Sequence, residues 1–273
     1  MVLSVTEKSY LRDSLKNKDH FLRPDGRNYD QFRPVEIYTD FLPSSNGSSR
    51  ILASDGTEIV ISIKTEVVDH SLTKDLVSID LDITGYRDDS AYVTSIRSIL
   101  SKTMKSKLNF TKEKGPKEKS VLQLTKKYSF KLYIDILVLS NYSYPLSLIS
   151  FAIYSALETT KLPMLISSED DLEIEELPIF HDYDMITLDF QSPLIFLVAF
   201  IEDNVFIDPS DAETQVANKC LILTWFENKI SSPIRTVSLN DDYTDGFTLL
   251  HLKESIEVVR KCAPEVLRAL KYQ

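Results

Sequence analysis

Glycine and cysteine are both scarce in this chain: its 273 residues include 6 glycines and 2 cysteines. With so few glycines, Gly-rich loops that bring backbone amides up to a phosphate are scarce as well. Cys220 and Cys262 are too few for a disulfide framework and favour a reducing compartment. No apolar run reaches the roughly 20 residues of a membrane span, and the N-terminus carries charges where a secretory signal would be apolar. The sequence therefore predicts a soluble intracellular protein.

The chain also has fewer basic than acidic residues. The chain has 31 Lys and Arg against 41 Asp and Glu, which gives a net charge of −10. This balance argues against a generally basic nucleic-acid coat, although it permits a local basic patch. The hydrophobic fraction of 43%, with 13 Tyr and 13 Phe, is typical of a packed globular protein. The length suits one large domain or two halves.

Residues 134–163 are the most informative stretch, because they read as a buried strand, a short turn and a helix. In α/β proteins such a strand-to-helix corner commonly holds an anion on the free N–H groups of the helix N-terminus. Here the corner reads NYSYPL at 141–146 and contains no glycine, lysine or arginine. Bulky side chains and a proline stand where backbone amides would have to approach a phosphate. The sequence predicts that this corner binds no phosphate.

Hydrophobic periodicity places the other elements around that corner. Alternation of apolar and polar residues predicts strands, including a hairpin in which Ile59, Ile61 and Ile63 share the core face. An unbroken apolar run at 194–201 is typical of a central strand covered on both faces. The predicted strands are 32–42, 50–53, 57–68, 77–83, 128–139, 194–201, 205–207, 220–226 and 230–237. The predicted helices are 3–15, with Leu3, Tyr10, Leu11 and Leu15 on one face, 90–105, 146–157 and 247–270, where Pro264 should kink or restart the helix.

Four stretches allow two interpretations each. RPDGR at 23–27 is either a surface turn or a docking element with paired arginines. The tract 101–120, whose seven lysines outweigh Glu113 and Glu118, is either a solvated insertion or a contact to a phosphate backbone. The acidic run at 165–177 favours a solvated edge over a metal site, because its spacing matches no metal motif. HDYD at 181–184 is expected to be structural and to lie in a loop, since no nucleophile motif is near it.

Several blocks carry a resemblance to a known family: RPDGR, FRPVEIYTDFLPSSNGSSRILASDGTEIVISIKTEVV at 32–68, the corner, HDYD, and SPIRTVSLND at 232–241. Over nearly the whole chain the sequence resembles the RNase PH family, and within it the ring subunits of the eukaryotic RNA exosome. The resemblance implies an α/β (α+β) RNase PH-like fold with two ribosomal-protein-S5-like βα halves. We expect an N-terminal helix and RPDGR arm at 1–30, a first half at 31–165 and a second half at 166–273.

The resemblance also implies partners and a place in the cell. The partners are the other RNase PH-like ring subunits, S1/KH-type cap proteins on one side of a six-membered ring, an associated hydrolytic exoribonuclease, and single-stranded RNA in the channel. No membrane is involved. The expected locations are the nucleus, including the nucleolus, and the cytoplasm.

For the site, the resemblance implies a loss of catalytic residues. Family enzymes use inorganic phosphate to cleave RNA from its 3′ end and hold the phosphate on Gly-Gly-Thr-Arg or a similar corner. Those positions are Ser143, Tyr144, Pro145 and Leu146 here, a degenerate phosphate site. An acidic pair that serves the chemistry maps near 208–214, where Asp208 and Glu213 are present but the last position is Thr214. We therefore expect no catalytic residue, no metal ligand and no cofactor.

RNA contacts are the remaining expectation. A family Arg-Arg pair that contacts RNA maps to Arg87 and Asp88, so one charge is kept and the other is inverted. The lysines of the basic tract are a rival RNA site: Lys112, Lys114, Lys117 and Lys119.

The favoured interpretation is a non-catalytic exosome ring subunit. It would support 3′-to-5′ RNA processing and degradation, including rRNA processing and mRNA decay, by shaping the RNA channel. The alternatives are an active phosphorolytic 3′-to-5′ exoribonuclease and a purely structural ring spacer that makes no RNA contact.

Overall fold

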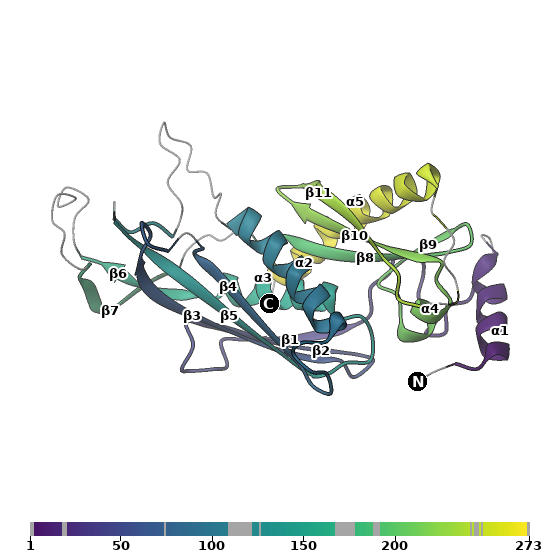
Figure 1. The fold of residues 1–273 in the computed structure, drawn as a ribbon, viewed down its shortest axis with the longest axis horizontal. Coiled ribbons are helices and arrows are strands. Elements are labelled where there is room, and N and C mark those ends of the chain that lie inside the picture. Colours follow the sequence, from purple (N-terminus) through teal and green to yellow (C-terminus); the bar gives the residue numbers. More distant parts are fainter. Residues whose placement is uncertain are drawn as a thin grey trace.

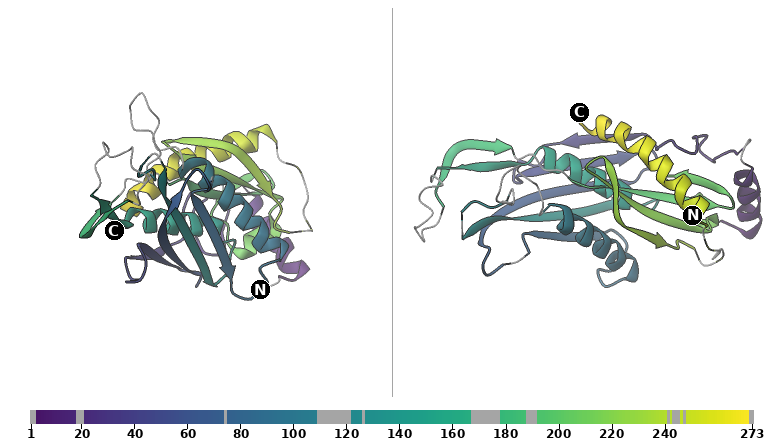
Figure 2. Two further views of the ribbon diagram at one scale, coloured as in Figure 1. Left: turned by 60° about the vertical axis from the view of Figure 1, so that its left-hand side comes forward. Right: turned by 90° about the horizontal axis from the view of Figure 1, so that it is seen from above.

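The computed structural model describes residues 3–17, 21–73, 75–108, 122–125, 127–166, 178–187, 192–240, 242, 246 and 248–271. Figure 1 shows two sheets side by side along the long axis, with a two-stranded ribbon at one end and the N-terminal helix α1 at the other. Figure 2 shows the same arrangement from two further sides. Helices pack on both sheets, which is the α+β architecture that the sequence predicts.

The first sheet has the strand order β1-β2-β3-β5-β4. Its strands are β1 (Val35–Thr39), β2 (Gly47–Ala53), β3 (Glu58–Asp69), β5 (Tyr128–Ser140) and β4 (Val77–Ile83). All neighbours are antiparallel except β4 and β5, between which the chain passes through α2 (Ala91–Leu108). The predicted hairpin is confirmed as β2 and β3, with Ile51 opposite Ile59. Ile59, Ile61 and Ile63 are fully buried, because alternate residues of a strand share one face.

The second sheet has the order β11-β10-β8-β9. Its strands are β8 (Leu194–Ile201), β9 (Asn204–Ile207), β10 (Lys219–Phe226) and β11 (Lys229–Val237). Every residue of β8 is buried, which confirms that the unbroken apolar run marks a strand covered on both faces. Helix α5 (Leu249–Lys271) packs on this sheet. It runs as one helix with Pro264 inside it, so the alternative that the helix restarts at this proline is wrong.

Helix α3 (Leu146–Glu158) lies between the two sheets and contacts β2, β3 and β8. Residues 146–157 are all buried, as expected for a helix that is apolar almost all round. Its serines are explained by hydrogen bonds to strand backbones. Ser147 Oγ accepts from Leu197 N at 3.0 Å, and Ser150 Oγ accepts from Ile195 N at 2.9 Å. These N–H groups lie in the part of β8 that β9 does not pair, so the helix satisfies donors that would otherwise be buried without a partner.

Three predictions fail at the edges of the molecule. HDYD lies in a strand, β7 (Phe180–Thr187), which forms a ribbon with β6 (Lys161–Leu165), rather than in a loop. Helix α1 (Val5–Lys16) begins after Leu3, and Tyr10 is 77% exposed, so the buried face is limited to Leu11 and Leu15. The short helix α4 (Asp211–Val216) was not predicted. Within the described ranges, no helix is both long and apolar enough for a membrane crossing.

The α3 serines give a matched pair of stability tests. Ser150→Ala removes the acceptor for Ile195 N and should lower the free energy of unfolding by about 1–3 kcal/mol. Ser155 lies on the same helix and is 2% exposed, but its hydroxyl has no hydrogen-bond partner among the described residues. Ser155→Ala should therefore be neutral or stabilising. Urea denaturation followed by circular dichroism measures both, and equal losses would contradict the role given to Ser150.

Candidate functional site

The corner between β5 and α3 carries bulky side chains and a proline in place of glycines. Pro145 occupies the N-cap position and makes no side-chain cap to the helix. Leu146 is fully buried, so a charged group at this position would lie in the core. Tyr142 donates its N–H to Thr57 Oγ1 at 3.2 Å, which ties one corner amide to the β2–β3 turn. The corner residues themselves thus offer a phosphate neither glycine nor a cationic side chain.

Ser143 carries the aliphatic hydroxyl of the corner, and this hydroxyl is bonded to internal partners. Its hydroxyl accepts a hydrogen bond from Arg33 Nη1 and donates one to Asp55 Oδ2 at 2.9 Å. Arg33 also forms an ion pair with Asp55. Burial by itself would raise the pKa of Asp55, but the Arg33 guanidinium and hydrogen bonds from Thr57 and Ser143 hold it below its usual value. Asp55 is therefore ionised at neutral pH.

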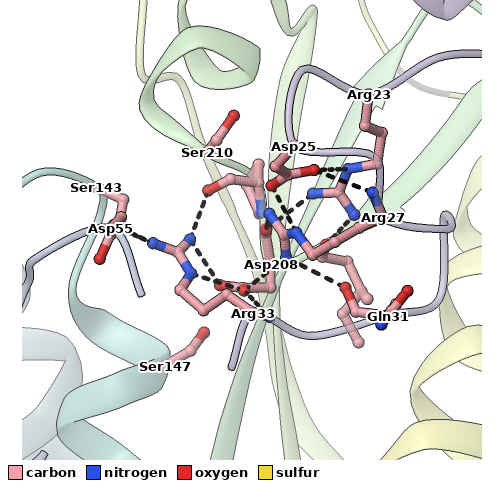
Figure 3. Close-up of polar contacts among 12 residues, drawn as sticks. Arg23, Asp25, Arg27, Gln31, Arg33, Asp55, Ser143, Ser147, Asp208 and Ser210 are labelled. Atoms are coloured by element: carbon pink, nitrogen blue, oxygen red, sulfur yellow. Dashed lines mark hydrogen bonds and ion pairs between the residues drawn. The ribbon is translucent and has the colours of Figure 1, made fainter. Parts of the chain in front are cut away.

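Arg33 connects the corner to the second sheet through Asp208 (Figure 3). Arg33 Nε donates to Asp208 Oδ2 and Arg33 Nη2 to Asp208 Oδ1, each at 2.8 Å, which makes a bidentate pair. Arg33 Nη2 also donates to the carbonyl of Pro209 at 3.1 Å. Burial alone would lower the pKa of Arg33, but Asp208 outweighs it and raises the pKa. Both side chains are buried, so their charges are compensated by each other and by their further partners Asp55 and Arg27.

The RPDGR arm docks at the same place: Pro24, Asp25 and Gly26 form an exposed turn, as predicted, while the arginines on either side of the turn are buried. Arg23 and Arg27 are 3% and 8% exposed. Arg23 makes a bidentate pair with Glu213, at 2.7 and 2.8 Å, and Arg27 Nη1 donates to Asp208 Oδ2 at 2.9 Å. Both arginines also donate to the backbone carbonyl of Asp208. The paired arginines are thus a docking element that holds the N-terminal arm on the second sheet.

The two carboxylates that survive from the expected acidic pair are already engaged. Both oxygens of Asp208 accept from arginine, and Glu213 also closes a capping box with Ser210 at the start of α4. The backbone at Asp208 has φ of +49°, an uncommon conformation for a residue other than glycine, and the surrounding hydrogen bonds hold it there. A general base needs a carboxylate oxygen that can reach a substrate proton, and Asp208 offers none. No cluster of His, Cys, Asp or Glu suited to a metal ion occurs in the described ranges.

The expected RNA contacts are only partly described. Arg87 lies in the turn before α2, as predicted, and its side chain is 88% exposed and pairs with Asp89 at 3.3 Å. Lys112, Lys114, Lys117 and Lys119 lie outside the described residues, as does most of the acidic run at 165–177. His181 and Asp184 of HDYD face each other at 3.3 Å on the exposed ribbon.

Sequence reasoning missed Arg33 and Asp55. Arg33 opened a predicted strand and Asp55 sat in an ordinary turn, so neither carried a local signal. Their partners lie 175 and 88 positions away along the chain, at Asp208 and Ser143.

Comparisons with known proteins all find relatives among RNase PH-like proteins and exosome components. A model of the 3′ exoribonuclease family, domain 1 (RNase PH), matches residues 31–163. The chain is 54% identical over 270 residues to Exosome complex component RRP42 of Saccharomyces cerevisiae, with 99% of each chain covered. It is 27% identical over 277 residues to Exosome complex component rrp42 of Schizosaccharomyces pombe, with 95% of this chain and 90% of the relative covered. A solved archaeal exosome core contains a chain of the same fold, with a TM-score of 0.72, 18% identity and coverage of 97% and 96%.

The buried ion pair predicts a large loss of stability when one partner is removed. Arg33→Met leaves Asp208 buried with one arginine fewer, and the free energy of unfolding should fall by about 3–5 kcal/mol. The control is Arg50→Met, because Arg50 pairs with Glu58 on the surface with its side chain 42% exposed. That change should cost about 0–1 kcal/mol. Chemical denaturation measures the free energy of unfolding of both variants. A similar small loss in both would contradict the role of Arg33 as a buried ion-pair partner that stabilises the fold.

Proposed function

Because the chain belongs to the RNase PH family of 3′ exoribonucleases, we propose that it is a non-catalytic ring subunit of an RNA exosome. The observation that carries this proposal is the state of the corner. Ser143 is bonded to Arg33 and Asp55, Leu146 is buried, and the corner has neither glycine nor a cation. Each charge-assisted contact that a phosphate would lose here is worth about 1.5–3 kcal/mol.

The same geometry argues against a hidden catalytic role for Asp208. Its carboxylate is held by Arg33 and Arg27, and freeing it would leave buried guanidinium groups without their partner. The RNase PH-like scaffold is thereby kept for assembly, while the chemistry is lost. In this role the chain shapes the channel for single-stranded RNA and supports 3′-to-5′ processing and degradation, including rRNA processing and mRNA decay.

The proposed partners follow from ring membership. They are the other RNase PH-like subunits, S1/KH-type cap proteins, an associated hydrolytic exoribonuclease and single-stranded RNA. The proposed locations are the nucleus, with the nucleolus, and the cytoplasm. We also propose the division of the chain into an arm at 1–30 and halves at 31–165 and 166–273.

The first test is for phosphorolysis. Full-length protein incubated with single-stranded RNA, magnesium and phosphate should release no nucleoside diphosphate above a protein-free control, because the corner cannot hold phosphate. A phosphorolytic enzyme of the family serves as the positive control. Phosphate-dependent release that follows the protein through size exclusion, and that the isosteric variant Asp208→Asn abolishes, would overturn the proposal in favour of an active exoribonuclease.

The second test concerns RNA contact by Arg87 in the assembled complex. Arg87→Glu should lower RNA affinity and reduce the slope of log affinity against log salt by about one unit, because one phosphate contact is lost. Arg268→Glu, which changes an exposed arginine of α5, is the matched control and should leave the slope unchanged.

A complex in which the basic tract is shortened only beyond α2, within residues 109–120, separates the alternatives. If only this change weakens binding, the RNA contact belongs to the lysines and Arg87 is structural. If neither change has an effect, the subunit is a spacer without RNA contact.

A further inference from the structure

A cavity of about 730 Å³ opens beside the corner. It lies where the first half, the N-terminal arm and helix α4 meet. Its wall includes residues 141–144 of the corner, Tyr86 before α2, Tyr92 in the first turn of α2, and residues 210–212 and 214 at α4. It is thus built around the degenerate phosphate site, but its chemistry is different from that of an anion site.

Tyrosine rings form much of this wall. The rings of Tyr86 and Tyr92 are stacked, with centroids 4.8 Å apart, and Tyr144 meets Tyr92 edge-on at 5.9 Å. Tyr86 and Tyr142 remain 48% and 61% exposed, so they can receive a ligand. Burial raises the pKa of Tyr92 to about 12, so the phenol stays neutral. The faces of such rings attract cations.

The charges around the cavity are out of balance. Among the described residues, five carboxylates gather here, from Asp25, Asp55, Asp208, Asp211 and Glu213, against three guanidinium groups, those of Arg23, Arg27 and Arg33. Asp208 and Glu213 are the buried ones. The other three carboxylates line the cavity, whereas no lysine or arginine of the described residues does.

Asp25 and Asp55 stay ionised in the cavity wall. Burial would raise the pKa of Asp25, but Arg27 and Arg23 outweigh it and lower the pKa, and the pKa of Asp55 is lowered as well. The cavity therefore offers negative charge and hydrogen-bond acceptors together with aromatic faces. A ligand group that is positively charged, planar and a hydrogen-bond donor would match all three of these features.

We propose that the cavity is a receptor for an arginine side chain presented by a neighbouring protein. A guanidinium group stacks on tyrosine and offers five donors to carboxylates, which an ammonium group cannot match. RNA is disfavoured, because its phosphates would face the carboxylates of the wall. The degenerate phosphate site has in this way become a docking site. The inference rests on the proposed function only in naming the neighbour as a ring subunit.

The direct test is a titration of the full chain, with ¹³C-labelled tyrosine rings, by N-acetyl-arginine amide. Tyr86 and Tyr92 signals should shift saturably, while Tyr183 on the β6–β7 ribbon should not. The neutral isostere N-acetyl-citrulline amide should bind at least about tenfold more weakly, because it lacks the charge. A response equal for both compounds, or no saturable shift, overturns the proposal.

Variants locate the site. Asp211→Asn should weaken binding of the arginine compound about tenfold, and Tyr86→Ala about fivefold. Asp182→Asn, on the exposed ribbon, is the matched control and should leave affinity unchanged. A short single-stranded RNA oligonucleotide that shifts the same tyrosine signals more strongly would overturn the proposal in favour of nucleic acid.

Pairwise affinity for purified ring subunits connects the site to assembly. Asp211→Asn and Tyr86→Ala should weaken binding to one subunit, whereas normal binding by both variants would overturn the docking role. The titration uses this chain alone, so its failure leaves the proposed function standing. A chain that binds arginine but pairs with no ring subunit would instead overturn the proposed function.

Discussion

The buried carboxylate of Asp208 is the group on which the rest of the arrangement depends. It accepts from Arg33 and Arg27, and its backbone carbonyl accepts from Arg23 and Arg27. Through these bonds one residue at the end of β9 joins the N-terminal arm, the β2–β3 turn and the β5–α3 corner. An unpaired charge at Asp208 would be strongly unfavourable. The arm, the β2–β3 turn and the corner must therefore all be in place for the buried charges to be paired.

Helix α3 is the apolar counterpart of that ion-pair network. It follows the corner directly, contacts strands of both sheets and completes the hydrogen bonding of β8 with Ser147 and Ser150. Its packing also leaves little room beside β2. A Cβ atom on Gly47 would lie 2.6 Å from the carbonyl of Ala156, so only glycine fits there. The two proposed halves therefore share a core.

Much of the fold could be predicted from local patterns, and the site could not. Alternation at Ile59, Ile61 and Ile63 fixed a face of β3, and the apolar run at 194–201 identified β8, because burial leaves a period in the sequence. Ion pairs leave no such period. Arg33 and Asp208 are ordinary charged residues until the fold brings them together. The missing glycines at the corner were visible in the sequence, but the contacts of Ser143 with Arg33 and Asp55 were not.

The docking of the arm has a consequence for the order of synthesis. Arg23 leaves the ribosome 190 residues before Glu213, its partner. At 5–20 residues per second this is a wait of roughly 10–40 s. During that interval Arg23 lacks its buried partner Glu213 and Arg27 lacks Asp208, so Asp25 is the carboxylate within the RPDGR arm that both arginines can reach. A segment that is made well before its partner is thus among the last to reach its final place, and closing so long a loop belongs to the slow, late steps of folding.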